Sequence, residues 1–136
     1  MTEAAVRVLV VDGDARVRQA LRALTEEERD IIVVGDASTL SELPAWDQTL
    51  EPDVILLELV LAQKEHGLAI VRELSQPGRH TVVVTSMCGC LRDPALAAGA
   101  RAYVEKGAAP EALVDAIRFA ASQSVPEAWH KNPDTV

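Results

Sequence analysis

Several polar side chains directly follow short apolar runs of the kind that form buried strands. In an open parallel sheet, ligands bind beyond the carboxyl ends of the strands, so such side chains are expected to converge. Three carboxylates, a hydroxyl pair and an ammonium group in one crevice would suit a cation or a phosphoryl group. An ordinary solvated rim of loop residues is the alternative. The residues concerned are Asp12, Asp14, Glu58, Thr85-Ser86 and Lys106.

The elements that must position these residues alternate between strand and helix patterns. This alternation predicts an α/β fold, in which parallel strands are joined by helices that cover both faces of one sheet. Strands are expected at Val6–Val11, Ile31–Val34 (ended by Gly35), Val54–Leu57, Thr81–Val84 and Ala102–Glu105. Helices are expected around Val17–Leu24, over Thr39–Leu50, from Gly67 to Leu74 after a Val60–His66 loop, from an Asp93-Pro94 cap to Gly99, and from Pro110 onward.

Length and composition limit the classes of protein that this chain can represent. Its 136 residues are enough for one domain. A net charge of −8 argues against direct binding to nucleic acid or to anionic lipid. We find no membrane-length apolar run and no signal pattern at the N-terminus, so we expect a cytoplasmic location. Residues 1–121 are predicted to form the domain, and 122–136 a tail or the start of a linker, in which Trp129 is out of place.

Five segments, in this order, resemble a response-regulator receiver domain, and most closely those that precede a LuxR-type helix-turn-helix. The resemblance covers about residues 6–121 and implies a flavodoxin-like (CheY-like) doubly wound sheet with strand order 2-1-3-4-5. It also implies a role in two-component signal transduction, within a phosphorelay that regulates transcription. The segments are VLVVDGDARVRQAL, VVGDAS, PDVILLEL, VVVTS and GARAYVEKGAAPEALVDAI.

The resemblance implies roles for four residues. The family phosphorylates an aspartate at the end of the third strand, using Mg²⁺ held by an acidic pair after the first strand. Asp12 matches the first acid of that pair, Thr85 the hydroxyl that contacts the phosphoryl group, and Lys106 the lysine. Tyr103 matches an aromatic residue whose rotamer reports activation, although an aromatic side chain that only packs at a sheet edge is an equal alternative.

The departures from the family pattern point to an atypical receiver. Gly13 replaces the second acid and removes an oxygen ligand for Mg²⁺. Glu58 replaces the phosphoacceptor and extends its carboxylate by about 1.5 Å. In-line phosphoryl transfer depends on positioning, so transfer to Glu58 should be very slow. Asp14 is offset by one residue and is either a helix cap or a substitute ligand. Ala62, Gly67 and Gly107 also depart from the family, which puts the shape of the 60–66 loop and a cis peptide after Lys106 in doubt.

We therefore expect no catalytic residue and no cofactor, with Mg²⁺ binding doubtful and Asp12 the remnant of its site. One hypothesis is that Glu58 pairs with Lys106, with a contact to Thr85, and holds the domain in one conformation. Simple replacement of a dispensable aspartate is the alternative.

Two further features leave alternatives open. Cys88 and Cys90 cannot form a disulfide framework, and they could bind a soft metal or oxidise. A closed zinc site needs about four ligands, however, and His66, His80 and His130 lack suitable spacing. Dimerisation in this family commonly uses the face of the fourth helix, fifth strand and fifth helix. The residues that could contribute to that face, or simply to the core, are Leu91, Leu96, Ala97, Tyr103, Ala116 and Phe119.

The leading interpretation is a phosphorylation-independent receiver domain that acts through protein–protein contacts or dimerisation and reaches DNA only through an output domain outside this chain. One alternative is a working phosphoacceptor, using Glu58 or Asp53, although Asp53 should lie at the opposite end of its strand. Another is a receiver that senses a small ligand. The enzyme classes we considered are disfavoured, because no histidine follows a predicted strand as a general base and no nucleophile elbow is present.

Overall fold

A five-stranded parallel sheet forms the centre of the computed structural model, which describes residues 5–39 and 50–122. The strand order is β2-β1-β3-β4-β5, as the resemblance implied. Every neighbouring pair is parallel. The α/β fold class is therefore confirmed. The strands are β1 (Val6–Val11), β2 (Ile31–Ala37), β3 (Val54–Glu58), β4 (Thr81–Ser86) and β5 (Ala102–Glu105).

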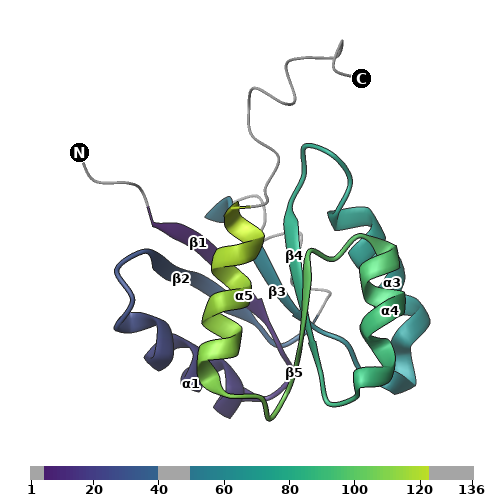
Figure 1. Cartoon of the computed structure of the whole chain (residues 1–136), viewed down its shortest axis with the longest axis horizontal. Helices are drawn as coiled ribbons and strands as arrows, with labels where there is room; N and C mark the ends of the chain where they lie inside the picture. Colours follow the sequence, from purple (N-terminus) through teal and green to yellow (C-terminus); the bar gives the residue numbers. More distant parts are fainter. Residues whose placement is uncertain (1–4, 40–49, 123–136) are drawn as a thin grey trace.

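Helices cover both faces of the sheet. Figure 1 shows α1 and α5 on one side and α3 and α4 on the other. Two short 3-10 turns precede α3 and α4, so that each of these helices starts directly from a turn. The helical elements are α1 (Ala15–Glu26), η2 (Leu61–Gln63), α3 (Lys64–Leu74), η3 (Gly89–Leu91), α4 (Arg92–Ala98) and α5 (Pro110–Ser122).

The apolar side chains of the central strands pack in two separate cores, one on each face of the sheet. Side chains alternate between the two faces of a strand. Val8 and Val10 accordingly pack in the core beneath α1 and α5. Leu9 and Val11 pack in the core beneath α3 and α4. The run in β1 is almost continuously apolar because both of its faces are covered.

Strand β2 corrects one prediction from the sequence. Gly35 does not end the strand, which continues to Ala37. Val8 pairs with Val33 and Leu9 pairs with Gly35, so Val34 is one extra residue in the ladder. A glycine inside a strand often marks such an irregularity, so Gly35 accompanies a shift in register rather than a stop.

The starts of α3 and α4 also differ from the predictions. Lys64–His66, expected to be loop, form the first turn of α3, where the acidic Glu65 suits the positive end of the helix dipole. Asp93 does not cap α4, because the helix begins at Arg92, directly after the η3 turn. Pro94 is tolerated there because the first turn needs no backbone donor. Gly99 ends α4 in a left-handed conformation, with φ of 120°, as expected.

Two sequence predictions lie mostly outside the described residues. They are the helix over Thr39–Leu50 and the tail over 122–136, which includes Trp129 and His130. The tail was predicted to start at Ser122, but this residue is the last of α5. Among the described residues, no helix is long and apolar enough to cross a membrane.

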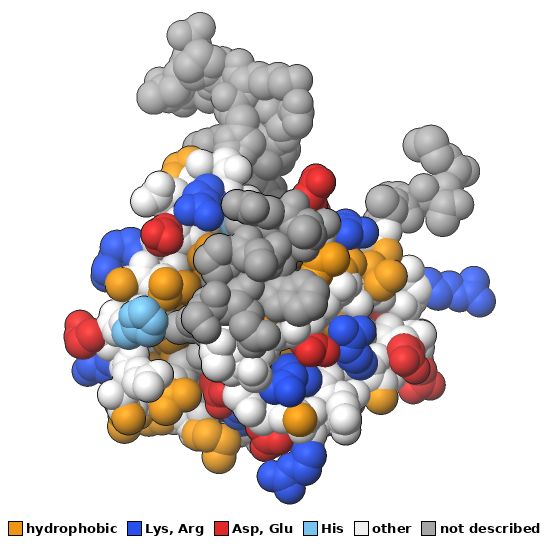
Figure 2. Space-filling view, turned by 180° about the vertical axis from the view of Figure 1, so that it is seen from behind, with side chains coloured by type: hydrophobic (Ala, Val, Ile, Leu, Met, Phe, Trp, Pro, Cys, Tyr) orange, Lys and Arg blue, Asp and Glu red, His pale blue; other side chains and the backbone are white. Residues whose placement is uncertain are grey.

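The surface mixes charges of both signs. Figure 2 shows Lys and Arg side chains interspersed with Asp and Glu side chains over the described part of the face seen from behind. The net charge of −8 is thus not accompanied on that face by a large basic area of the kind that binds a phosphate backbone.

Candidate functional site

Asp12, Glu58 and Lys106 lie at the same end of the sheet, where the carboxyl ends of three strands are found. Asp12 directly follows β1, Glu58 ends β3 and Lys106 directly follows β5. Strand β1 pairs with β3, while β4 separates β3 from β5. The backbone of Lys106 is fixed to β4, because its N–H donates to the carbonyl of Ser86 at 2.8 Å. The long lysine side chain then extends across the carboxyl ends of the strands to reach the two acids.

The ammonium group of Lys106 lies between the two carboxylates. Its Nζ is 2.8 Å from Oδ2 of Asp12 and also forms an ion pair with Oε2 of Glu58. The other oxygen of Glu58, Oε1, accepts a hydrogen bond from the backbone N–H of Gly13 at 3.2 Å. Asp12 is 3% exposed, and the side chains of Lys106 and Glu58 are 17% and 18% exposed. The predicted contact between Glu58 and Lys106 is confirmed.

Burial and hydrogen bonding set the protonation of this cluster. Burial raises the pKa of Asp12, and hydrogen bonds from Lys106 and from the backbone of Asp14 only partly offset this effect. Burial alone would lower the pKa of Lys106, but its hydrogen bonds to Asp12 and Glu58 raise that pKa above the usual value. The lysine is therefore held in its charged form.

The other two acids considered from the sequence lie outside this cluster. Asp14 caps α1, where its Oδ1 accepts from the backbone N–H of Arg16 at 2.9 Å, and it also pairs with the Arg16 side chain. Of its two predicted roles, the structure shows the helix cap. Asp53 precedes β3 and accepts from the backbone N–H of Arg7 at 2.9 Å, at the end of the sheet opposite to Glu58, as expected.

Thr85 and Tyr103 are placed differently from each other. Thr85 is buried and pairs with Glu58 in the sheet register. The predicted Thr85 contact is not seen: within the described residues we find no hydrogen bond from its hydroxyl to Glu58 or Lys106. Tyr103 is 7% exposed and packs in the core beneath α3 and α4, while its hydroxyl donates to the carbonyl of Cys88. Tyr103 therefore combines core packing with a contact to the loop after β4.

The donor set of the cluster does not fit Mg²⁺. This ion requires several hard oxygen ligands. The carboxylates of Asp12 and Glu58 are both engaged by Lys106, and position 13 supplies no side-chain oxygen. Across residues 5–39 and 50–122, no group of three or more His, Cys, Asp or Glu residues is arranged to hold a metal ion.

Two contacts near the site were not found from the sequence, and a third was left open there as oxidation of the two cysteines. One is the Gly13 N–H bond to Glu58, and another is the bond from Arg18 to the carbonyl of Asp12 at 2.6 Å. Both use backbone groups, which no residue pattern reveals. The third is a disulfide between Cys88 and Cys90. Their Cys-x-Cys spacing was the available signal, and the pairing leaves no free thiol for a metal.

A crevice of about 580 Å³ opens beside the ion cluster. It is lined by Asp12, Gly13, Glu58 and Leu59, and by residues after β2, in η2 and in α3. The latter are Ser38, Thr39, Gln63, His66 and Gly67. The peptide bond after Lys106 is trans, and Gly107 has a φ of 99°, a conformation that favours glycine.

Comparison with known proteins decides the family. The profile of the response regulator receiver domain matches residues 8–118, which is most of the chain. The chain belongs to the response regulator receiver family. This receiver domain is 39% identical over 126 residues to the transcriptional regulatory protein LiaR of Bacillus subtilis, covering 90% of the chain and 58% of LiaR. It is 35% identical over 119 residues to the response regulator GacA of Pseudomonas aeruginosa, covering 83% of the chain and 54% of GacA.

Solved structures agree with this assignment. A LuxR-family two-component response regulator from Aurantimonas sp. SI85-9A1 superposes on the receiver domain with a TM-score of 0.76 and 27% identity. The match covers 88% of this chain and 86% of that one. The receiver domain spans little more than half the length of the curated relatives that it matches. It is thus a receiver domain of the two-component response regulators.

Proposed function

We propose that this receiver domain regulates transcription through protein–protein contacts and without phosphorylation or bound Mg²⁺. The observation that carries the proposal is the position of the Lys106 ammonium between Asp12 and Glu58. A cation is already supplied there by the chain itself, so the site has no need of a metal to neutralise its acids. Glu58 is held by both Lys106 and the Gly13 N–H, which favours one fixed conformation.

The same geometry supports the proposed loss of phosphorylation. A phosphoacceptor must present a free carboxylate oxygen in line with the leaving group, next to a cation that stabilises the charge. One oxygen of Glu58 is ion-paired and the other accepts a backbone hydrogen bond. Phosphorylation of Glu58 would have to break both contacts. It would also have to proceed without the second Mg²⁺-binding acid of the family, because position 13 is a glycine.

We further propose that the domain works in the cytoplasm, takes part in no enzymatic reaction of its own and contacts DNA only through an output domain in a longer protein. Of the two relatives, LiaR is a transcriptional regulatory protein and GacA is a response regulator. The chain matches only part of each relative, which supports a modular regulator.

Intact-mass spectrometry after incubation with acetyl phosphate and Mg²⁺ tests the proposal. We expect no phosphoryl adduct on the wild type. The matched comparison is the double variant Glu58→Asp with Gly13→Asp, in which both missing acids are restored. An ideal Cβ at position 13 lies 3.8 Å from the Ser38 carbonyl and 3.9 Å from Glu58 Oε1, so a Cβ there makes only ordinary van der Waals contacts, and the simultaneous Glu58→Asp change shortens the neighbouring acid. We expect an adduct on this variant, and an equally abundant adduct on the wild type would refute the proposal.

A second candidate function is binding of a small molecule in the crevice beside Glu58. Its volume of about 580 Å³ is within the range of small-molecule sites. Its lining combines hydroxyl, amide, imidazole and carboxylate groups with the apolar Leu59 and Val60. A thermal-shift screen of metabolites, repeated on Gln63→Leu, tests it: stabilisation of the wild type alone is the expected result, and no response from a broad panel would count against it.

A further inference from the structure

The loop between β4 and α4 contains a disulfide that closes over a single residue. Cys88 and Cys90 are paired, with Gly89 between them, and they are the two cysteines of the chain. Cys90 is exposed and Cys88 is half-buried. The backbone N–H of Cys90 donates to the sulfur of Cys88 at 3.0 Å, which adds a second contact within the same short turn. A thiolate in solution can therefore reach this disulfide.

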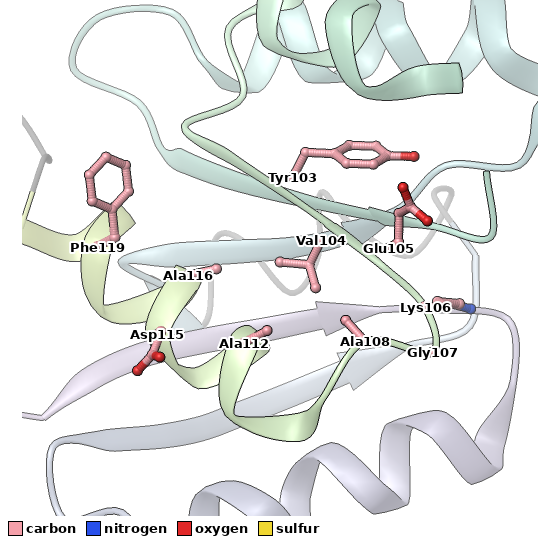
Figure 3. A pocket seen from close by; sticks show the side chains of 10 residues that line it. All are labelled: Tyr103, Val104, Glu105, Lys106, Gly107, Ala108, Ala112, Asp115, Ala116 and Phe119. Atoms are coloured by element: carbon pink, nitrogen blue, oxygen red, sulfur yellow. The ribbon is translucent and has the colours of Figure 1, made fainter. Parts of the chain in front are cut away.

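The loop is connected to β5 by two side chains. The buried Tyr103 donates its hydroxyl hydrogen bond to the carbonyl of Cys88. Glu105 lies against Gly89, so closely that a Cβ at position 89 would collide with its carboxylate. Figure 3 shows the Tyr103 ring on one side of β5, its hydroxyl directed toward the Lys106 end of the strand. Cys88 and Gly89 are therefore in direct contact with Tyr103 and Glu105.

The disulfide limits how far the loop can extend. The Cα atoms of Cys88 and Cys90 are 5.2 Å apart. Two residues in fully extended conformation span about 7 Å. Opening of the disulfide thus removes this limit on the turn that carries the Cys88 carbonyl. The next residue, Leu91, is 1% exposed and packs in the core, so the far side of the turn stays anchored.

We propose that Cys88 and Cys90 form a reversible dithiol–disulfide couple that sets the conformation of the β4–α4 loop against Tyr103. This proposal is independent of the proposal that the domain works without phosphorylation. The partner by chemical class is a small dithiol, or a protein dithiol, in the reducing direction and a low-molecular-weight disulfide in the oxidising direction.

The exchange chemistry balances as follows. A thiolate of the dithiol attacks Sγ of the exposed Cys90, which breaks the Cys88–Cys90 bond, forms a mixed disulfide and releases Cys88 as a thiolate. The second thiolate of the reductant then attacks the reductant sulfur that is bonded to Cys90, which closes the cyclic disulfide of the reductant and releases Cys90 as a thiolate. The two cysteine thiolates take up two protons, and the reductant leaves as a cyclic disulfide after giving up two electrons. Oxidation by a small disulfide reverses these bond changes and releases two small thiols.

The first test counts reactive thiols on the full 136-residue chain. The chain is equilibrated with defined mixtures of reduced and oxidised dithiothreitol, alkylated with iodoacetamide and weighed intact. We expect unmodified chain in oxidising mixtures, doubly alkylated chain in reducing mixtures, and full reversal on reoxidation. A chain that remains doubly alkylated in every mixture, or that forms only disulfides between chains, would overturn the proposal.

The second test asks whether the redox state reaches β5. Amide chemical shifts are compared between the two states for wild type, for Cys88→Ser with Cys90→Ser, and for Tyr103→Phe. We expect the wild type to shift at residues 86–92 and also at 103–106, and the double serine variant to show no response to reductant. Tyr103→Phe should keep the alkylation pattern but lose most of the shift at 103–106. Shifts confined to the loop in the wild type would refute the link to β5.

Discussion

Lys106 compensates two carboxylates that would otherwise be costly to keep near the protein interior. Asp12 is almost fully buried, and Glu58 and Lys106 are less than one-fifth exposed. Burial of a charge is expensive unless it is paired and hydrogen-bonded. Removal of the lysine would leave two like charges near each other with only backbone donors to satisfy them.

Substitution of Lys106 should therefore destabilise the fold. We expect Lys106→Met to lower the free energy of unfolding by about 1–3 kcal/mol, below the range for a fully buried pair because the site is partly exposed. Urea denaturation at neutral pH measures the change. Lys64→Met, which removes an exposed lysine at the start of α3, is the matched control and should change stability little. Equal effects of the two substitutions would contradict the assigned role of Lys106.

The same cluster predicts a dependence of stability on alkaline pH. The pKa of Lys106 is raised in the folded state above its reference value of 10.5. The folded state thus binds the proton more tightly, so this stabilisation is complete below pH 10.5 and is lost as pH rises through the raised pKa. The stability difference between wild type and Lys106→Met should shrink as the pH rises above 10.5. A difference that stays constant to high pH would be inconsistent with the ion cluster.

At the residue scale, sequence reasoning found the side chains of the site but not their backbone partners. The pairing of Glu58 with Lys106 could be predicted from the sequence because these opposite charges lie at the carboxyl ends of strands in the same sheet. The Gly13 N–H could not, because every residue other than proline carries the same donor. For Leu91 the sequence left a contact face and the core as alternatives, and the structure places it in the core.

At the scale of elements, one arginine connects the C-terminal helix to the turn between α1 and β2. Arg118 on α5 forms two hydrogen bonds with Asp30, at 2.8 and 3.0 Å, and also pairs with Glu28. The paired geometry of a guanidinium with a carboxylate is stronger than a single surface contact. These bonds join residues that are far apart in the sequence and fix α5 beside α1.

Removal of this arginine should loosen α5 locally. We expect Arg118→Met to increase amide hydrogen exchange in the second half of α5, while exchange in β3 stays unchanged. Arg101→Met, at an exposed arginine, is the control. Hydrogen bonding to Arg118 lowers the pKa of Asp30, so this contribution is present above pH 3.8 and is lost as pH falls through the lowered pKa. The difference in exchange should therefore vanish in acid.

Element types were easier to predict than element ends. All five strands lie where apolar runs predicted them, because burial on two faces demands such runs. Their ends were missed where the next residues are polar but still paired, as for Glu58 in β3 and Ser86 in β4. The start of α3 was missed because a 3-10 turn leads into it, and such turns leave little trace in hydrophobic periodicity.

At the scale of the molecule, one face remains a candidate for self-association. Phe119 on α5 is 52% exposed, and a cavity of about 760 Å³ lies between β5 and α5 beside it. Figure 3 shows Phe119 and Ala116 on the helix and Tyr103 and Val104 on the strand around this cavity. An exposed aromatic ring beside a cavity of this kind is typical of a contact surface.

If the chain dimerises through this face, Phe119→Ser should shift it toward the monomer. Sedimentation velocity over a range of protein concentrations gives the dissociation constant, and we expect it to rise at least about tenfold, which is 1.4 kcal/mol. Ile32→Ser is the matched control, because Ile32 is 48% exposed on β2 at the opposite edge of the sheet. A concentration-independent monomer for the wild type would exclude this dimer.

The close approach of position 13 to Glu58 has a consequence for how this pocket can evolve. A new acid at position 13 would start 3.9 Å from Glu58 Oε1 and would be repelled while the glutamate remains. Shortening Glu58 alone would give up its present tethers and still leave the neighbouring acid missing. Neither Gly13→Asp nor Glu58→Asp alone therefore restores the acids of the family pattern. The two acids of the family pattern can therefore be installed without mutual repulsion only when both positions change together, Glu58→Asp with Gly13→Asp.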